Sequence, residues 1–311
     1  MSLPALLEQR LRLPLVAAPM FLVSNPALVS ACCNSGIVGS FPALNQRESA
    51  GFAAWLDEIE ASLSANAAPF AVNQIVHKSN TRLEQDLAVC VKHKVPIVIT
   101  SLGAVPEVNE AVHSYGGIVL HDVIHDRFAK SAIRKGADGL IAVAAGAGGH
   151  AGTLSPFALI SEIREWFDGP LLLSGAIATG RAVLAAQAMG ADLAYIGSPF
   201  IATTEANAQP DYKRMIVESG AMDIVTSSLF TGVSGNYLAP SIRAAGMDPD
   251  NLEGADPSAM NFGSNAAKAK AWSQIWGSGQ GIGAVRDIVP AATRIDRLSR
   301  EYAAAKAAIC G

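Results

Sequence analysis

The sequence of 311 residues predicts an α/β fold, a (β/α)8 TIM barrel with a second, smaller, mainly helical domain inserted late in the chain. Eight short apolar runs recur before residue 200, with helical stretches between them. None of these runs alternates cleanly between apolar and polar residues, as expected of parallel strands that are covered on both faces. The strand rhythm then stops after Phe200. Eight strand–helix units followed by a change of pattern favour a barrel that carries an addition.

Composition restricts the class of protein. Hydrophobic residues make up 50% of the chain and charged residues 16%, so a large core is expected and disorder is not. A formal net charge of −4 without a long basic stretch argues against a nucleic-acid partner. No apolar run is long enough to span a membrane, and the N-terminal residues do not form a signal peptide. The four cysteines lack metal-ligand spacing. We therefore expect a soluble cytoplasmic protein with buried thiols and no metal site.

The expected elements follow from local signals, taken in chain order. Asn25 followed by Pro26 is an N-cap with proline at the first helical position, and Gly36 closes that helix. The segments 136–138 and 190–192 both read Gly-Ala-Asp and precede the sixth and eighth strands, so each is a helix end, a glycine cap and a strand entry. The eight expected strands begin at Leu15, Ile37, Phe70, Pro96, Ile118, Gly139, Leu171 and Leu193.

A doubly wound parallel sheet is the alternative fold. It would require a G-x-G-x-x-G sequence after the first strand, where this chain instead has Ala-Ala-Pro-Met at residues 17–20. The barrel is therefore preferred.

The late region defines the expected domain division. Residues 206–272 read as helices and loops, which we expect to form a small helical domain that caps the barrel mouth. Residues 1–205 and 273–311 would form the barrel. An Ala-rich final helix, from about Ile288 to Ile309, is expected to return to the barrel wall.

The most informative segment is the loop Gly146-Ala147-Gly148-Gly149-His150-Ala151-Gly152, which follows the sixth expected strand. Glycines let the backbone approach a flat ligand closely, and a histidine among them can exchange a proton near neutral pH. Barrel active sites lie at the C-terminal ends of the strands. The other strand ends carry Ala18-Pro19-Met20, Asn73-Gln74, Thr100-Ser101, His121-Asp122, Ser174-Gly175-Ala176 and Gly197-Ser198.

The loops after the last two strands are candidates for a phosphate site. Their glycine N–H groups could bind the phosphate of flavin mononucleotide (FMN) or of a phosphorylated substrate. Ordinary turns would also contain glycine and serine there. A third glycine cluster, at residues 277–283, is expected either to fold over the mouth and offer Gln280 to a ligand or to be a plain connection. Met20 could equally be core filler, and Tyr195, inside the last strand, is expected in the core.

These residues resemble the nitronate monooxygenase family, formerly called 2-nitropropane dioxygenases. The resemblance covers nearly the whole chain and rests on the strand ends above, on the Gly-Gly-His-Ala-Gly loop and on Trp-Gly-Ser-Gly-Gln-Gly at residues 276–281. Gly-Gly-His is also found in the related enoyl-acyl-carrier-protein reductases, and the late glycine loop favours nitronate monooxygenase. The resemblance implies FMN on a (β/α)8 barrel and the oxidation of alkyl nitronates or nitroalkanes with dioxygen to carbonyl compounds and nitrite.

The resemblance also implies roles for individual residues. His150 would be the catalytic residue. From their own place at strand ends, Ser101 and His121 are expected to contact the substrate, with packing or a bond to Asp122 as the alternative for His121. Asn73 would bond the polar edge of the flavin. The other cofactor-binding residues implied are Ala18, Pro19, Met20, Gly148, Gly149, Ser174, Gly175, Ala176, Gly197, Ser198, Gly279 and Gln280.

Three departures from the family pattern bear on these roles. Gly175 is followed by Ala176 where the family often has a second glycine, and Pro199 stands where an arginine is common. At the fifth strand end the chain has His121-Asp122 where some relatives have a lysine, so no basic anchor for the flavin is identified.

Two other functions remain open on the sequence alone. One is an FMN-dependent NAD(P)H reductase of quinones or enoyl thioesters on the same scaffold. The other is a phosphate-binding barrel without flavin. The sequence also leaves the oligomeric state open, and a homodimer is compatible with it.

Overall fold

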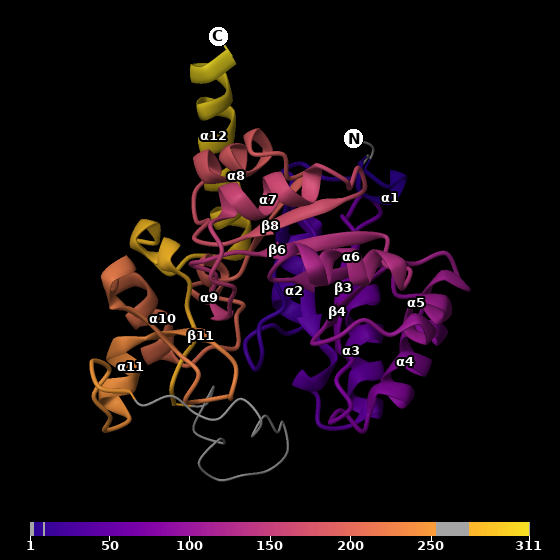
Figure 1. Ribbon diagram of the computed structural model, residues 1–311, viewed down its shortest axis with the longest axis horizontal. Helices are drawn as coiled ribbons and strands as arrows, with labels where there is room; N and C mark the ends of the chain where they lie inside the picture. The colour runs from indigo at the N-terminus through magenta and orange to yellow at the C-terminus, as the bar shows by residue number, and fades with distance from the viewer. Residues whose placement is uncertain (1–2, 9, 253–273, 311) are drawn as a thin grey trace.

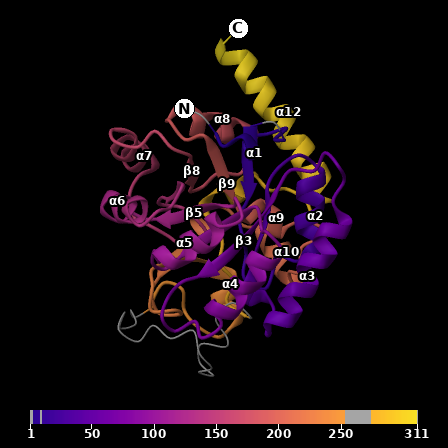
Figure 2. The same cartoon turned by 90° about the vertical axis from the view of Figure 1, so that its right-hand side faces the viewer.

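The computed structural model describes residues 3–8, 10–252 and 274–310 of the chain and contains an eight-stranded parallel sheet closed into a barrel (Figures 1 and 2). The strand order is β1-β9-β8-β6-β5-β4-β3-β2. A parallel bridge between Val16 and Val38 closes the two ends, where Val38 N donates to Leu15 O at 3.2 Å and Ala17 N donates to Val38 O at 2.8 Å. The predicted TIM barrel is confirmed.

All eight predicted strands form; the second begins two residues later than expected and the fourth one residue later. The barrel strands are β1 (Leu15–Ala17), β2 (Gly39–Pro42), β3 (Phe70–Ile75), β4 (Ile97–Ser101), β5 (Ile118–Val123), β6 (Gly139–Val143), β8 (Leu171–Ser174) and β9 (Leu193–Ile196). The helices around and beyond them are α1 (Ala5–Glu8), α2 (Pro26–Asn34), α3 (Ser49–Ser62), α4 (Leu83–Lys92), α5 (Pro106–His113), α6 (Asp126–Arg134), α7 (Pro156–Arg164), α8 (Gly180–Ala188), α9 (Ser198–Ile201), α10 (Pro210–Glu218), α11 (Ala239–Ala244) and α12 (Ala291–Cys310).

The local signals read from the sequence have clear structural counterparts. The side chain of Asn25 accepts a hydrogen bond from Leu28 N at 2.9 Å and so caps α2. Gly136 and Gly190 adopt φ angles of 97° and 111°, which favour glycine after a helix. The two Gly-Ala-Asp segments end alike: Asp138 accepts from Val119 N at 2.7 Å, and Asp192 accepts from Leu171 N at 2.8 Å. Each carboxylate thereby secures the beginning of a neighbouring strand.

Strand residues alternate between two cores, and this alternation decides which side chains can reach the site. The inner core fills the barrel with residues such as Ile99 of β4 and Leu120 of β5. The outer core contains Val98 and Val119, one position away on the same strands, together with residues of the surrounding helices such as Leu56. The bottom of the inner core is completed by Leu7 of α1.

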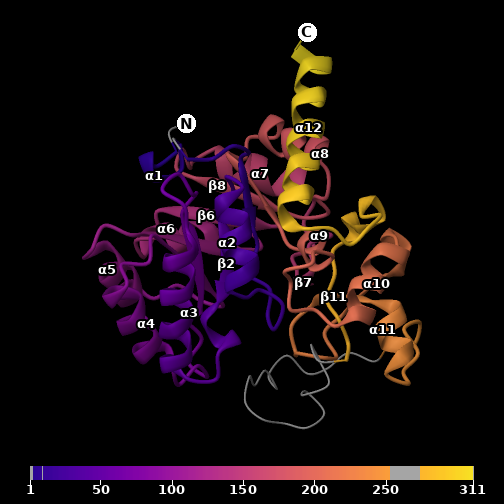
Figure 3. The same ribbon diagram turned by 180° about the vertical axis from the view of Figure 1, so that it is seen from behind.

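The late region contains α10 and α11, as expected, and also two strands that the sequence did not predict. The strand β10 (Ile224–Ser227) pairs antiparallel with β11 (Gly235–Leu238). The other edge of β11 pairs with β7 (Gly149–His150), the two-residue strand that follows β6 (Figure 3). Residues 253–272 lie outside the described part of the chain, so the division at 206–272 stays a prediction.

The final helix packs along α8, as Figures 1 and 3 show. Gly180, the first residue of α8, allows this contact, because a Cβ atom there would lie 2.0 Å from Leu298 O. The Glu301 carboxylate accepts a hydrogen bond from Gly180 N at 2.8 Å. The C-terminal end of α12 projects beyond the rest of the molecule. Among the described residues, no helix combines the length and apolar character needed to cross a membrane.

Candidate active site

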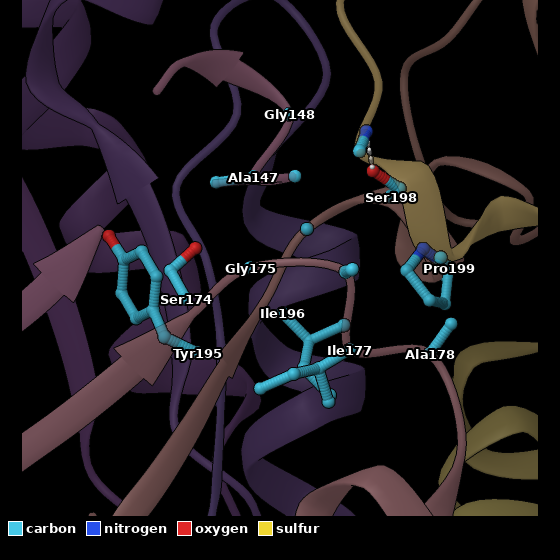
Figure 4. Close-up of a pocket in the computed structure, with 15 residues that line it drawn as sticks. Ala147, Gly148, Ser174, Gly175, Ile177, Ala178, Tyr195, Ile196, Ser198 and Pro199 are labelled. Carbon is cyan, nitrogen blue, oxygen red and sulfur yellow. Dashed lines mark hydrogen bonds between the residues drawn. The ribbon is translucent and has the colours of Figure 1, made fainter. Parts of the chain in front are cut away.

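A pocket with an empty volume of about 270 Å³ opens at the C-terminal ends of β6, β8 and β9 (Figure 4). It brings together seven of the predicted site residues, namely Gly148, Ser174, Gly175, Ala176, Gly197, Ser198 and Gly279. The hydroxyl groups of Ser174 and Tyr195 lie on one side and Ser198 on the other. Tyr195, which the sequence placed in the core, therefore lines the pocket. The residues that form the pocket carry no charged side chain.

Glycine is required in this pocket because three loops touch through their backbones. A Cβ atom on Gly148 would lie 2.6 Å from Gly279 N, and one on Gly281 would lie 2.6 Å from Ala176 O. Gly279 N donates a hydrogen bond to Ser198 Oγ at 2.9 Å, which ties the third glycine cluster to the end of β9. The cluster at 277–283 therefore folds against the other two loops.

The loop after β8 has the features of an anion site. Gly175 and Ala176 have φ angles of 149° and 53°, a conformation that non-glycine residues rarely adopt. Within the described chain, the N–H groups of Gly175, Ile177 and Ala178 donate no hydrogen bond to protein. Backbone N–H groups of a turn that lacks acidic neighbours bind phosphate well.

These features fit the phosphate end of FMN, although they include no basic side chain. The pocket lies between the loops after β6, β8 and β9 and the late glycine cluster, where the phosphate and the chain next to it would be bound.

The end of β1 lies beside this pocket. A Cβ atom on Gly197 would lie 3.6 Å from Met20 Sδ and 3.7 Å from the Ala18 Cβ. Pro19, between them, is half-buried. Ala18 and Met20 thus meet the end of β9, and their contact with a flavin stays a prediction.

A polar group lies at the top of the barrel interior, where the inner core ends. Asn73 Nδ2 donates to Ser101 Oγ at 2.7 Å and to Ile99 O at 3.1 Å, so these two predicted site residues are in contact. The Asp122 carboxylate is hydrogen-bonded by the Ser101 side chain and by Leu102 N. Leu102 has a φ of 62°, a strained conformation for leucine. Burial raises the pKa of Asp122 to about 6, although the hydrogen bonds from Ser101 and Leu102 act in the opposite direction.

The structure does not place His121 in the mouth. His121 pairs with Thr100 in the sheet, and its Nδ1 lies 2.7 Å from Thr100 Oγ1. Both residues are two positions beyond the outer-core residues Val119 and Val98, so they face the helices. Burial lowers the pKa of His121 to about 4, and Lys135 at the end of α6 lowers it further. The prediction of a substrate contact is corrected, because strand alternation gives the inward place to Asp122.

His150 is held between the barrel and the late strands. It belongs to β7, where Gly149 pairs with Asn236 and His150 pairs with Gly235 of β11. Its Nε2 lies 3.0 Å from Thr231 Oγ1. Burial lowers the pKa of His150 to about 4, so its imidazole is neutral at pH 7.

Gln280 lies at the edge of this arrangement. Its backbone N donates to Gly146 O at 2.9 Å, which joins the third glycine cluster to the loop after β6. Its side chain is exposed and does not line the pocket, although Gln280 Oε1 would lie 2.9 Å from a Cβ atom on Gly146.

Sequence reasoning missed Asp122, Thr231 and Asn236. Asn236 donates to Ala147 O, with an Nδ2–O distance of 2.6 Å, and so supports the loop before His150. Asp122 stands beside His121 at the same strand end, but the apolar residues of β5 face both ways, so the run does not show which of the two points inward. Nothing in the sequence indicates that Thr231 and Asn236 reach a loop more than 80 residues away.

The chain is similar to known proteins in both sequence and structure. A family model described as nitronate monooxygenase matches residues 78–301. A nitronate monooxygenase of Paraburkholderia phytofirmans is 29% identical, over 93% of this chain and 92% of that protein. The solved nitroalkane oxidase from Streptomyces ansochromogenes has a TM-score of 0.83 and 26% identity, covering 98% of this chain and 100% of that one.

The structure of FabK from Thermotoga maritima also matches, with a TM-score of 0.80 over 98% of this chain and 97% of that one. Its identity of 23% supports the fold alone. The family match covers most of the chain and includes the loops that form the pocket, His150 and the late glycine cluster. The chain therefore belongs to the nitronate monooxygenase family of oxidoreductases.

Proposed function

We propose that this protein oxidises alkyl nitronates, with FMN bound across the barrel mouth and dioxygen as the oxidant, to give carbonyl compounds and nitrite. The observation that carries the proposal is the glycine-lined pocket. Among the described residues, several backbone N–H groups of its lining donate no hydrogen bond to protein, and the loop that lines it as far as Gly148 reaches His150 two residues later. The family match and the nitroalkane oxidase relative support the same reaction.

The residues available to hold FMN occupy four places. The phosphate would be bound by the N–H groups of Gly175, Ile177 and Ala178 and by the hydroxyl of Ser198. Ala18, Pro19 and Met20 would contact the ring, and Gly148, Gly149 and Gly279 leave room for close approach. Asn73, with Ser101 and Asp122 behind it, would bond the polar edge of the ring. Gln280 would approach from the exposed rim.

The protein's part in the reaction is to bind, orient and exchange a proton. When bound, FMN would supply the electron transfer from the substrate to dioxygen. A nitronate is already a carbanion equivalent, so its oxidation needs no strong base. A neutral nitroalkane must first lose a proton from the carbon that bears the nitro group. The neutral imidazole of His150 can accept that proton.

The test begins with the visible absorption spectrum of the purified protein, with FMN added if needed. A flavin spectrum, followed by dioxygen consumption and nitrite release with propyl-2-nitronate, is the expected result. A protein that stays colourless after FMN is added would exclude the proposal and favour a barrel without flavin.

Anaerobic mixing with NADH or NADPH separates the proposal from a reductase on the same scaffold. We expect the flavin absorbance to persist with reduced nicotinamide and to bleach with the nitronate. Rapid bleaching by NADH or NADPH, without turnover of the nitronate, would assign the chain to the quinone or enoyl thioester reductases.

A further inference from the structure

Two of the three glycine loops of the pocket are paired with the same edge of β11. The loop after β6 reaches β11 through β7, where Gly149 pairs with Asn236. The late glycine cluster reaches it at the next residue, where Gly277 forms an antiparallel bridge with Tyr237, and Ser278 N donates to Asn236 O at 3.1 Å. The opposite edge of β11 is taken by β10 along all four residues. Asn236 therefore lies at the point where the edge passes from one loop to the other.

The side chain of Asn236 makes two further hydrogen bonds, and the partners fix their directions. Its Nδ2 lies 2.6 Å from Ala147 O, a carbonyl oxygen that can only accept, so the amide N–H group faces it. The amide oxygen Oδ1 then faces β10, where the Thr226 hydroxyl donates to it at 2.5 Å. Asn236 is only 3% exposed, and Ala147 lines the pocket (Figure 4). Thr226 thus orients the amide that supports a pocket residue.

We propose that Asn236 is a positioning residue for the cofactor pocket, which holds the loop of Ala147 and the loop of Ser278 at one fixed separation. The inference rests on the proposed function, since it takes FMN as the ligand of this pocket. The two loops have little freedom to shift, because a Cβ atom on Gly148 would lie only 2.8 Å from Ser278 C. A small displacement of either loop therefore changes the space that is left for the ligand.

The cost of losing the Asn236 side chain falls on the pocket itself. Among the described residues, Ala147 O accepts a hydrogen bond from Asn236 alone, and Ala147 is only 4% exposed. A buried acceptor that loses its donor is unfavourable, so the loop would move until Ala147 O finds another partner. The bonded geometry and the ligand-binding geometry would then no longer coincide.

The first test compares FMN binding in two variants that lose the same kind of side chain. Asn236→Leu retains the approximate shape and removes both hydrogen bonds. Asn109→Leu is the matched control: Asn109 of α5 is 2% exposed, its Nδ2 donates to Lys135 O at 2.8 Å, and it does not line the pocket. We expect both variants to lower the urea midpoint of unfolding, but only Asn236→Leu to weaken FMN binding, by roughly tenfold or more. Fluorescence titration with FMN measures the affinity.

The role of Thr226 gives a test with a conservative rescue. Thr226 is exposed, so its substitution changes little else. Thr226→Val removes the donor that orients the Asn236 amide, and Thr226→Ser retains it. We expect Thr226→Val to weaken FMN binding by a few-fold and Thr226→Ser to bind FMN as the wild type does.

The separation of the loops has a readout that does not depend on activity. Hydrogen–deuterium exchange of the full chain, measured by mass spectrometry with and without FMN, reports on residues 146–151 and 276–281. We expect faster exchange in both segments in Asn236→Leu and wild-type exchange there in Asn109→Leu.

Wild-type FMN affinity in Asn236→Leu, an equal loss of affinity in Asn109→Leu, or unchanged exchange in both segments would overturn the inference. If Asn236→Leu does not fold, the Thr226 variants decide, and equal FMN affinity of the valine and serine variants would overturn it. A wild-type protein that binds no FMN would instead remove the proposed function, and the exchange of the two loops would still report on Asn236.

Discussion

His121 and His150 show how the place of a residue in the fold separates two otherwise similar side chains. Burial lowers the pKa of each to about 4, and each contacts a threonine hydroxyl. His121 faces the helices because its strand alternates between two cores. His150 belongs to a short strand beyond the barrel, next to the glycine-lined pocket. Environment makes both imidazoles neutral, but only the second lies beside the pocket in which we propose that the cofactor binds.

His150→Asn should separate the two substrates of the proposed reaction. Asparagine cannot accept the proton of a neutral nitroalkane, so kcat/KM for 2-nitropropane should fall by about 10²–10⁴-fold. Turnover of the nitronate should fall much less, and FMN should stay bound, because His150 does not line the pocket. Steady-state dioxygen consumption measures the turnover of the two substrates, and the visible spectrum measures bound FMN. Unchanged turnover of 2-nitropropane would remove His150 from the proton transfer.

Asp122→Asn should reverse part of the cost of burying a carboxylate. Burial raises the Asp122 pKa from 3.8 to about 6, so the folded protein holds a proton that the unfolded chain releases. This group's contribution to stability is greatest at low pH and is lost as the pH rises to about 6. From about pH 4 to pH 7, the unfolding free energy of the variant relative to wild type should rise by about 3 kcal/mol.

Urea denaturation of the FMN-free protein at several pH values measures this difference. The exposed Asp168→Asn serves as the control and should give curves parallel to wild type. A constant offset between Asp122→Asn and wild type across this range would contradict the assignment.

At the residue scale, the sequence predicts pocket residues well where they directly follow an apolar strand. Gly148, Ser174, Gly175, Gly197 and Ser198 could be identified because a buried strand leads directly to each loop. Asp122 was passed over in favour of its neighbour because the pattern of β5 does not show which side chain faces inward. Its place follows from the pairing of β4 with β5, which only coordinates reveal.

At the scale of elements, the pocket depends on three loops that meet backbone to backbone. The glycines between them determine how closely they approach, and the loops come from remote parts of the chain. The loops after β6 and β8 follow predicted strands, but the third precedes a helix and has no strand of its own. The sequence marks all three as glycine-rich. It does not show that they touch.

Gly148→Ala should therefore disturb the pocket, whereas Gly220→Ala should not. The new Cβ at position 148 would lie 2.6 Å from Gly279 N, while position 220 has no heavy atom within 4 Å. We expect Gly148→Ala to weaken FMN binding by roughly tenfold and to lower stability by about 1–3 kcal/mol, the usual cost of overpacking. Fluorescence titration with FMN and urea denaturation measure the two effects. Equal behaviour of the two variants would show that the loops are not held in contact.

The strands β10 and β11 show where element prediction fails. Each has four residues, and their pairing is with one another and with a two-residue strand far away in the sequence. Short strands gain their stability from partners, so local pattern carries little information about them. The barrel strands, in contrast, are apolar because both faces are buried. Each apolar run can therefore be identified as a strand from its own residues, without knowledge of its partners.

At the scale of the whole molecule, buried histidines should make the protein sensitive to acid. His121 and His150 each have the pKa lowered from 6.5 to about 4, so both take up protons on unfolding between these values. Asp122 releases one proton in the same range. Two gained and one lost leave a net uptake of about one proton, so stability should fall by about 1.4 kcal/mol for each pH unit below 6.

Urea midpoints of the FMN-free protein at about pH 7, 6 and 5 measure this dependence. The double variant His121→Gln, His150→Asn should reverse its sign, because Asp122 alone then leaves a net release of about one proton on unfolding. Wild-type stability that stays level or increases on acidification would show that these imidazoles are not buried in the neutral form.

The pairing of β7 with β11 also has a consequence for how the protein is made. Every strand of the barrel precedes residue 197 in the chain. The strand that pairs with His150 follows much later, at residues 235–238. A polypeptide terminated between these points would therefore contain all the barrel strands but lack the strand that pairs with His150, the residue that we propose as the base.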